Sequence, residues 1–537
     1  MSAVPKNDRV SPEVVADAHS RHAGSIRAGA KELGISRSSF RRKLASVGKL
    51  DKPIAAGSIE GTTAKKRKLP PAGKVARYIL TSAQNNTYVH ESAWENLQAL
   101  AKHYDAEIIV GTYTYNQNRY GQMSVKRGRD KQEEHRLWYD PKIVPFIRDE
   151  RIELAKGLVW CGEMNILPTA VHPLAGLESY SARASAIFPH AKLAVRSIPT
   201  MQGEGVKFNY TTGTVTQRNY IQKREGVIAE FHHIYGGLLV EANANGNWWV
   251  RQLNEDNDGV IQDLDVIATN GKITTGNRVE AVTHGDLHGT FADPGVVKTS
   301  LDMVDTLRPK FQFLHDVMEG AAVNPHERKY GNNHARFATY LRGYAQLENE
   351  LTDTAKLLES YDRPFAKTIL VDSNHDNPWI VRWLQEFDYR KDPSNAELFL
   401  KLQERMYAEI RSGKMPRDIN MLEFALRNVG YKSKAQFLIT DESFLICGRK
   451  IECGMHGHLG PNGRFGSPEN LSRMGRKANT AHTHTAGIWN GLYVAGTTSK
   501  LRWGYNLGPS GWTNTHIVTY PSGKRTLITI FGGKWRA

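Results

Sequence analysis

The alternation of apolar and polar positions predicts helices at the start of the chain and a mixture of helices and strands in the rest. Residues 11–22 open with a serine and a proline, which is typical of a helix N-terminus. In residues 24–48, Gly34 separates two further helical patterns, and the second carries basic side chains around an apolar face. This order of a helix, a glycine turn and a basic helix is the pattern of a helix-turn-helix. We therefore predict a small all-α domain over residues 1–48.

The next segments predict a linker and then an α/β domain. Residues 49–74 are rich in Gly, Pro, Ala and Thr without periodicity, which predicts a flexible basic linker whose run Lys65–Lys68 is a solvated tether. From residue 75, a strand pattern, an amphipathic helix and a second strand pattern follow in the order of a parallel α/β unit. Residues 75–262 contain no phosphate-loop or dinucleotide glycine pattern, so the role of this domain stays open.

Residues 263–537 predict another α/β domain. Apolar strand patterns lie on either side of residue 270, a long helical stretch covers 334–361, and an apolar strand pattern then runs into a polar turn near residue 374. Helical patterns continue to about residue 428, and the last hundred residues are strand-rich. The predicted fold class is therefore α/β, with a small all-α domain in front.

Composition adds limits to this picture. A chain of 537 residues is too long for one hydrophobic core, and 40% hydrophobic with 23% charged residues is typical of a soluble globular protein. No apolar run is long enough to span a membrane, and the polar N-terminus lacks the apolar core of a secretory signal. The three cysteines are sparse and odd in number, which favours a reducing, cytoplasmic compartment and buried, unpaired thiols at Cys161, Cys447 and Cys453.

The positive charge is concentrated at the start of the chain. The net charge is +16, and residues 1–77 carry +11 of it, from 17 lysines and arginines against 6 acidic residues. Such a basic module suggests a polyanionic partner, and the helix pair resembles the Fis-type helix-turn-helix, which reads DNA with its second helix. A helical hairpin for a protein partner is the alternative. A lone helix-turn-helix usually works in pairs, so a homo-oligomer is compatible with this pattern. The predicted DNA-contacting residues are Arg37, Ser38, Arg41, Arg42 and Lys43.

Five polar clusters follow apolar strand patterns in the last half of the chain. They are Asp286 with His288, Asp316 with Glu319 three residues later, Asn374–His375–Asp376, His456 with His458, and His482 with His484. Strand ends converge at one edge of an open α/β sheet, and alternate residues of an extended segment point the same way. Carboxylate, imidazole and amide groups suit Mn²⁺, Fe²⁺ or Zn²⁺. The clusters therefore predict a metal site, large enough for two ions that share a carboxylate.

The order of these clusters resembles the calcineurin-like metallophosphoesterase superfamily, over about residues 278–500. That family's motifs are D-x-H, G-D-x-x-D/E, G-N-H-D/E, a lone His and G-H-x-H, and here His315, Ser373 and Ala481 replace motif glycines. The resemblance implies a metallophosphoesterase β-sandwich flanked by helices.

The resemblance also implies roles for individual residues. Asp286, His288 and His484 would hold one metal, Asp316 would bridge, and Asn374, His456 and His482 would hold the second. His456 is preferred to His458 because it stands where the family's lone His stands. His375 would be the family's non-ligand histidine beside the scissile phosphate, oriented by Asp376. His284 falls outside the pattern, and we expect it either to support the ligands from behind or to be exposed.

These features together predict a two-metal phosphodiesterase. Mn²⁺ is the expected ion, with Fe²⁺, Zn²⁺ and Mg²⁺ as alternatives, and the ions would supply the nucleophile and the Lewis acid. The attached helix-turn-helix points to DNA, which makes the chain similar to the recombination and repair nucleases of the superfamily and, in layout, to large phage-encoded metallophosphoesterases that act on host DNA. The alternatives are a phosphatase or cyclic-nucleotide phosphodiesterase, and a non-catalytic DNA-binding regulatory protein.

Overall fold

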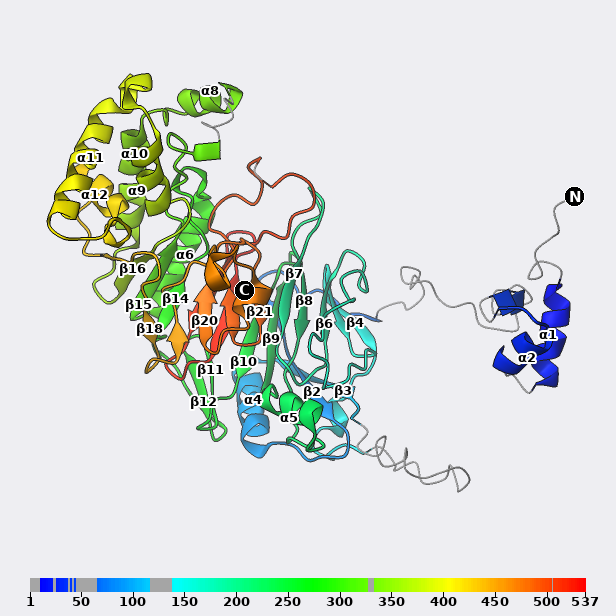
Figure 1. The fold of residues 1–537 in the computed structure, drawn as a ribbon. Helices are drawn as coiled ribbons and strands as arrows, with labels where there is room; N and C mark the ends of the chain where they lie inside the picture. The colour runs from blue at the N-terminus through cyan, green and yellow to red at the C-terminus, as the bar shows by residue number, and fades with distance from the viewer. Residues whose placement is uncertain are drawn as a thin grey trace, which may run out of the picture. The chain divides into compact units, whose positions relative to one another are not determined.

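The chain is a mixed α/β protein whose helices and strands are drawn in Figure 1. The structure is a computed structural model that describes residues 10–22, 26–36, 39–40, 43–44, 65–115, 138–326, 333–504 and 506–537. Its contacts divide the chain into two compact units, Met1–Thr63 and Ala64–Ala537.

The N-terminal unit contains the first two predicted helices, α1 (Pro12–Arg21) and α2 (Ile26–Glu32). Ser11 caps α1 through a hydrogen bond from the Val14 N–H, and Gly34 adopts a φ of 61° at the predicted turn. A small core joins the helices and the segment after the turn, and it consists of Val15, Ala16, Ala18, Ala30, Ile35, Phe40 and Leu44. The helices and the turn are thus confirmed.

The basic residues after the turn are only partly within the described residues. The Ser39 N–H donates to Ser36 Oγ at 3.0 Å, which is the predicted cap, and Lys43 is half-buried in a helical segment. The other predicted DNA contacts, Arg37, Ser38, Arg41 and Arg42, lie outside the described residues.

The end of the predicted linker joins the fold. Lys65 and Lys66 form the short strand β1, which pairs in parallel with β4 (Arg151–Ala155). Lys65 Nζ lies 3.0 Å from Glu150 Oε1, an ion pair that the linker prediction did not include. The backbone of these two residues therefore belongs to a strand, while their side chains are exposed, as the prediction of a solvated segment requires.

The strand–helix–strand unit predicted from residue 75 is present as β2 (Val75–Gln84), α4 (Glu91–Tyr104) and β3 (Glu107–Tyr113). β2 and β3 pair in parallel, and β9 (Gly236–Asn243) and β10 (Trp248–Asn254) complete a four-stranded sheet in the order β10-β9-β2-β3. The apolar face of α4 packs on this sheet through Trp94, Leu97 and Leu100. A three-stranded antiparallel sheet follows, made of β11 (Val260–Asp263), β12 (Val266–Thr269) and β13 (Lys272–Thr274).

An eleven-stranded sheet crosses the boundary predicted at residue 262. Its order is β1-β4-β5-β6-β8-β7-β21-β22-β20-β19-β18. Its strands besides β1 and β4 are β5 (Leu158–Cys161), β6 (Ser185–Phe188), β7 (Val195–Ile198), β8 (Lys207–Thr211), β18 (Leu445–Ile446), β19 (Ile451–Glu452), β20 (Lys477–Thr480), β21 (Gly487–Trp489) and β22 (Leu492–Val494). β7 and β21 join the two halves by antiparallel pairing. Residues 75–262 and 263–537 therefore belong to one compact unit rather than to separate bodies.

A six-stranded sheet carries the strands that precede most of the predicted ligands. Its order is β17-β16-β15-β14-β23-β24. The strands are β14 (Ala281–Thr283), β15 (Phe311–His315), β16 (Lys367–Val371), β17 (Gln436–Phe437), β23 (Thr515–Thr519) and β24 (Arg525–Thr529). β14, β15, β16 and β17 run in parallel, so their carboxyl ends meet at one edge of the sheet.

One side of the six-stranded sheet packs against the eleven-stranded sheet, and helices lie on its other side (Figure 1). Phe313 and Ile369 of the smaller sheet share a core with Ile446 and Ile451 of the larger one. The remaining described helices are α5 (Arg224–Phe231), α6 (Pro294–Leu307), α8 (Asn333–Leu341), α9 (Leu347–Tyr361), α10 (Asn377–Glu386), α11 (Ala396–Arg411), α12 (Met421–Asn428) and α13 (Pro468–Leu471), with short 3-10 turns at Val144–Phe146, Gly289–Phe291, Tyr389–Lys391, Pro393–Asn395, Pro416–Asp418 and Pro461–Gly463.

Two expectations from composition can be compared with the structure. Cys161, Cys447 and Cys453 are buried and unpaired, as predicted. Among the helices of the described ranges, none has both the length and the apolar character needed to cross a bilayer.

A buried ion-pair network links the four-stranded sheet to the three-stranded sheet. Arg251 of β10 lies 2.6 Å from Glu241 Oε2 and 2.8 Å from Asp263 Oδ1, and it is only 2% exposed. Although burial opposes ionisation of Glu241, Arg251 and Arg77 hold its pKa at about 2.

We expect Arg251→Met to lower the free energy of unfolding by about 3–5 kcal/mol, because two buried carboxylates lose their partner. Chemical denaturation followed by fluorescence measures this loss. Arg77→Met is the matched control, since Arg77 contacts Glu241 at 2.9 Å from a position whose side chain is 27% exposed. If Arg77→Met lowered the free energy of unfolding as much as Arg251→Met, the burial of Arg251 would not explain its contribution to stability.

Candidate metal centre

The predicted ligands lie where loops of the two packed sheets meet. Asp286 and His288 follow β14, Asp316 follows β15 and Asn374 follows β16, all at the carboxyl ends of parallel strands. The histidines at positions 456, 482 and 484 come from loops after β19 and β20 of the eleven-stranded sheet. An isolated bridge between Asp286 and Thr497 connects the loop after β14 to the segment that follows β22 of the eleven-stranded sheet. The fold thus brings residues from distant parts of the sequence to one place.

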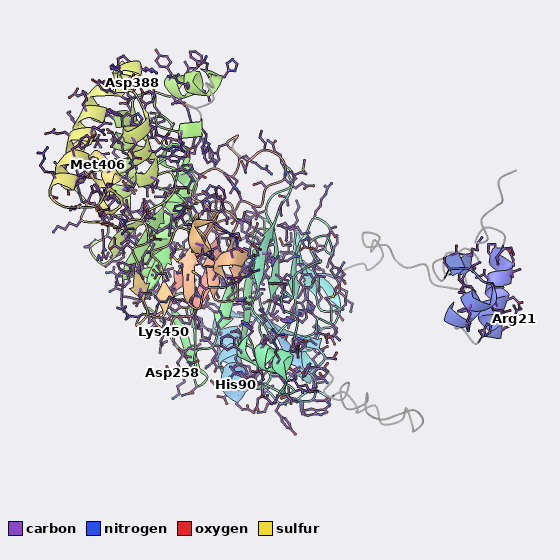
Figure 2. The ribbon with its side chains drawn as sticks, in the orientation of Figure 1. Arg21, His90, Asp258, Asp388, Met406 and Lys450 are labelled. Carbon is purple, nitrogen blue, oxygen red and sulfur yellow. The ribbon has the colours of Figure 1, made fainter. Side chains whose placement is uncertain are left out.

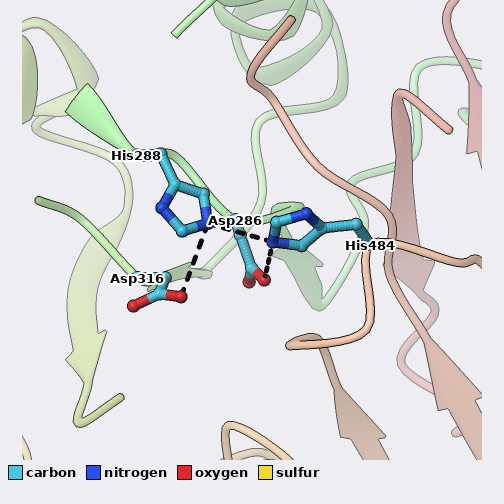
Figure 3. A group of neighbouring side chains, drawn as sticks. All are labelled: Asp286, His288, Asp316 and His484. Atoms are coloured by element: carbon cyan, nitrogen blue, oxygen red, sulfur yellow. Dashed lines mark hydrogen bonds and ion pairs between the residues drawn. The ribbon is translucent and has the colours of Figure 1, made fainter. Parts of the chain in front are cut away.

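Four of these side chains form a compact buried cluster, shown in Figure 3. His484 Nε2 lies 2.9 Å from Asp286 Oδ2 and 2.9 Å from His288 Nε2. His288 Nε2 lies 3.5 Å from Asp316 Oδ2. The four ligand atoms all lie within 4.8 Å of one another, a spacing that lets them bind one cation together.

His456 connects the carboxylates on a second side. Its Nδ1 lies 3.8 Å from Asp286 Oδ1, and its Nε2 lies 3.7 Å from Asp316 Oδ2. The ring of His482 is 5.1 Å from the ring of His456, while the ring of His458 lies 5.5 Å from His456 and forms no ion pair with a carboxylate among the described residues. These contacts agree with the preference for His456 over His458.

Asn374 is the predicted ligand with the least direct evidence. Its Oδ1 is buried and has no hydrogen-bond partner among the described residues. No contact joins it to the carboxylates at positions 286 and 316 within the described part of the chain. Its role as a ligand therefore stays a prediction.

The backbone is strained at four of the predicted ligands. His288, Asp316, His482 and His484 have φ values of 45°, 48°, 71° and 55°, in the left-handed region that non-glycine residues rarely adopt. Strain of this kind persists only where the surrounding structure imposes it, and it clusters at functional sites. Hydrogen bonds hold the first loop in place, since the His288 N–H donates to the Asp316 carbonyl at 2.8 Å.

The glycine of the first motif has a steric reason. A Cβ at Gly285 would lie 2.7 Å from backbone atoms of Gly496 and Thr497. Only glycine therefore lets the loop that carries Asp286 approach the loop after β22 this closely.

The electrostatics of the cluster favour a cation. Burial raises the pKa of Asp286 well above its usual value, and the charge of Asp316 raises it further. Burial also opposes ionisation of Asp316, but His375, His288 and His456 outweigh it and hold the pKa of Asp316 well below its usual value. Within the described ranges, no lysine or arginine forms an ion pair with either carboxylate, so the two negative charges lack a permanent counter-ion.

The donor set fits divalent metal ions. Asp286 is fully buried, and the side chains that contact it among the described residues are the imidazoles of His456 and His484, which is a costly arrangement unless a cation binds the carboxylate. Burial lowers the pKa of His482 to about 4 and lowers those of His456 and His484 well below their usual value. Neutral imidazoles and ionised carboxylates are the forms that bind metals. These clusters can therefore hold metal ions.

Sequence reasoning did not assign a role to Glu319, which the structure places at the centre. Its Oε2 lies 2.9 Å from His288 Nδ1 and 3.5 Å from His375 Nδ1. Burial opposes ionisation of Glu319, but the two histidines outweigh it and lower its pKa. Carboxylates often orient metal-bound histidines in this way. The signal was present in the sequence, because Glu319 stands three residues after Asp316 in the D-x-x-E part of the second motif.

His375 lies beside the cluster rather than in it. Its ring stacks on Trp379 at a centroid distance of 4.0 Å, and its residue is 6% exposed. Burial opposes protonation of His375, but Asp316 and Glu319 outweigh it and raise its pKa to about 9. The ring is therefore a cation at neutral pH.

Asp376 has partners that the sequence did not indicate. It accepts hydrogen bonds from the N–H groups of Val317 and Met318, at 3.2 and 3.1 Å, and its charge also raises the pKa of His375. It therefore fixes the loop that carries Asp316, and Glu319 is the carboxylate that faces His375. Ser373 Oγ lies 2.8 Å from Asp376 Oδ2 and also contacts Asp316. The serine that replaces a motif glycine thus links the two carboxylates.

His284 is not exposed. Its ring is fully buried and packs edge-on against Tyr361 and His516, at centroid distances of 5.0 Å each. It contacts no predicted ligand side chain within the described residues, so it supports the loop from behind.

We expect Mn²⁺ to raise the melting temperature of the protein, because an ion that binds only the folded state stabilises it by mass action. Asp286→Asn should abolish this response and should raise the melting temperature in chelator, since it removes one of two repelling buried carboxylates. Differential scanning fluorimetry over a metal titration measures both effects. Asp258→Asn, an exposed position labelled in Figure 2, is the control. An unchanged Mn²⁺ response in Asp286→Asn would rule out Asp286 as a ligand.

Comparison with known proteins places the chain in a family. No family model matches it. It is 38% identical over 505 residues to Protein A1 of Escherichia phage T5, and the match covers 91% of this chain and 87% of that protein. The aligned region spans nearly the whole of both chains. The chain therefore belongs to the family of phage T5 Protein A1.

Proposed function

We propose that this protein is a metal-dependent phosphodiesterase that cleaves DNA, with the buried Asp/His cluster as its catalytic centre. The observation that carries the proposal is the convergence of Asp286, His288, Asp316, His456 and His484 in the order of the metallophosphoesterase motifs. The packing of a six-stranded sheet on a larger sheet, with helices α9 to α12 beside the smaller one, supports a metallophosphoesterase-type sandwich. The relationship to a phage protein supports the resemblance to phage-encoded enzymes.

In this proposal the centre holds two divalent ions. Asp286, His288 and His484 would hold one, Asn374, His456 and His482 would hold the other, and Asp316 would serve as a ligand for the pair. Such ions, when bound, supply Lewis acidity toward a phosphate ester and an activated water at neutral pH. Mn²⁺ is the proposed ion, because carboxylate, imidazole and amide donors suit it, and Fe²⁺, Zn²⁺ and Mg²⁺ are the alternatives.

His375 is the proposed residue for handling charge on the substrate. Stacking on Trp379 and the facing carboxylate of Glu319 fix the orientation of its ring. Glu319 faces Nδ1, so Nε2 is the nitrogen that can donate to a phosphate oxygen or protonate the leaving oxygen. The residue acts as a cation because Asp316 and Glu319 raise its pKa.

DNA is the proposed substrate because of what is attached to the catalytic unit. Residues 1–77 carry a net charge of +11, and the described part of the N-terminal unit has the helix–turn arrangement of a DNA-binding module. We place its action in the cytoplasm of the infected cell. A homo-oligomer is compatible with this proposal.

Two other functions remain candidates. A phosphatase or cyclic-nucleotide phosphodiesterase would use the same centre without a preference for DNA. A regulatory protein would bind DNA through the N-terminal unit without cleaving it. Substrate preference and metal-dependent cleavage separate these functions.

We expect the protein to cleave plasmid and linear DNA in Mn²⁺ and to leave both intact in chelator. Gel electrophoresis of time courses measures cleavage, and turnover of a chromogenic phosphodiester measures the centre without DNA. Simultaneous Arg41→Ala, Arg42→Ala and Lys43→Ala should weaken DNA cleavage and spare the chromogenic reaction. Intact DNA binding with no cleavage under any metal would refute the nuclease. If the triple variant kept wild-type activity on both DNA and the chromogenic phosphodiester, the result would favour the phosphatase.

His375→Asn should lower the turnover rate by about 10²-fold or more while the Mn²⁺-induced rise in melting temperature persists, since the residue acts on the substrate rather than on the metals. Initial rates on the chromogenic substrate and the metal titration are both measured. His103→Asn, an exposed histidine of α4, is the matched control. Full activity of His375→Asn would refute the assigned role, and loss of the metal response would make His375 a ligand instead.

A further inference from the structure

A second pocket lies outside the metal centre, between strands β7 and β21 and the segment after α13. It has a volume of about 330 Å³, in the range of pockets that bind small ligands. β7 and β21 are hydrogen-bonded neighbours in the eleven-stranded sheet, so the floor of the pocket is rigid (Figure 1). We call it the basic pocket, and its polar lining includes His172, Lys192, Arg196, Glu469, Arg473 and Trp489.

Lys192 is buried in this pocket without an acidic partner. It is 7% exposed, and its Nζ donates one hydrogen bond within the described residues, to the Val171 carbonyl at 2.6 Å. Burial lowers the pKa of Lys192 to about 8. A buried ammonium group without a counter-ion is costly, which indicates that the site is built to receive an anion.

The other charges in the pocket also favour the binding of an anion. Arg196 and Arg473 form no ion pair within the described part of the chain, and both line the pocket with Lys192. Glu469 is the single carboxylate of the lining, and its Oε1 accepts a hydrogen bond from the indole N–H of Trp489 at 3.2 Å. Burial and then these three cations lower the pKa of His172, with Glu469 opposing them. Three cations therefore face one exposed carboxylate.

Trp489 adds an aromatic surface beside these cations. Its half-buried indole lies 5.9 Å from the Arg196 guanidinium. A Cβ at Gly487 would lie 2.3 Å from the indole, so the glycine allows the ring to lie flat on its own strand and fixes its position. Cations that bind phosphate and an aromatic ring that stacks on a base are the two elements of single-stranded nucleic-acid sites.

We propose that the basic pocket binds one nucleotide of a single-stranded nucleic acid, with its phosphate on Lys192, Arg196 and Arg473 and its base on Trp489. The anion site follows from the pocket alone, while the choice of a nucleic-acid strand rests on the proposed function. β21, which carries Trp489, begins three residues after the candidate ligand His484, so one short segment of the chain contributes to both sites.

The test measures binding of a labelled single-stranded oligothymidylate to the full chain in chelator, by fluorescence anisotropy over a salt series. Lys192→Met and Arg473→Gln should each weaken binding several-fold and lower the salt slope by about one, as the loss of a phosphate contact does. Lys102→Met, on the exposed face of α4, is the control for net charge. Affinity and salt slope equal to the control in both variants would overturn the proposal.

Two further measurements use the chemistry of the pocket. Wild-type affinity should fall as the pH rises through about 8, where Lys192 loses its proton, and Lys192→Met should lack this step. His172, His190, His232, Arg196, Arg473 and Glu469 are the other titratable or charged groups around Lys192. Burial lowers the pKa values of the three histidines, which moves their titration away from this range. A step that persists in Lys192→Met would therefore contradict the assignment.

Trp489→Leu should weaken oligonucleotide binding while Trp489→Phe retains it, because either ring can stack on a base. Inorganic phosphate and a mononucleotide are the competitors that identify the ligand. We expect the mononucleotide to compete better than inorganic phosphate, and the oligonucleotide to bind more tightly than either. Competition by inorganic phosphate alone, with Trp489→Leu unchanged, would overturn the nucleotide assignment.

The melting temperature separates this role from a structural one. Lys192→Met should melt at the same temperature as the wild type or higher, since it removes a buried charge that lacks a counter-ion. A lower melting temperature with unchanged DNA binding would make Lys192 structural. Metal-dependent cleavage of DNA tests the proposed function separately, because the binding assay contains no metal.

Discussion

Two carboxylates, Asp286 and Asp316, are buried beside each other with no lysine or arginine paired to either among the described residues, and much of the surrounding structure offsets their repulsion. His288 and His375 lie on one side, and Glu319 contacts both of them. The backbone N–H groups of Val317 and Met318 donate to Asp376, and those of Glu319 and Gly320 donate to Glu350. The network keeps negative charge in the protein interior at a place where a cation can bind.

The left-handed backbone at the ligands is the second part of this arrangement. Residues such as His288 and His484 adopt it because parallel strands end at one edge and the loops of two sheets must turn toward each other over a short distance. The strain is opposed by strand pairing on both sides, including the pairing of β14 with β15 and with β23. The candidate metal-binding side chains are therefore held in position before any ion binds. This favours binding, because these side chains lose little further freedom when the ion binds.

The local parts of this site could be predicted from the sequence, and the connections between them could not. D-x-H and H-x-H patterns after apolar strands carry their own geometry, so Asp286 and His484 were predictable as neighbours of a metal. The contacts of Asp376 with Val317 and Met318 join segments that are far apart in the chain, so no local sequence pattern predicts them. The eleven-stranded sheet was missed for a related reason, because strands such as β19, with two residues, are too short to show a periodicity. His284 looked equivalent to its neighbours in the motif, and only packing shows that it is buried.

The order in which the chain is synthesised determines when the candidate metal site can form. The pairing partner of β14 on one side is β23, and the histidine that joins Asp286 lies at position 484, so the first motif waits for segments made some two hundred residues later. Domains generally fold as units as they leave the ribosome, and a nascent chain that lacks its distant partners cannot close the site. In this chain, the cluster around Asp286 is therefore incomplete until synthesis is nearly finished.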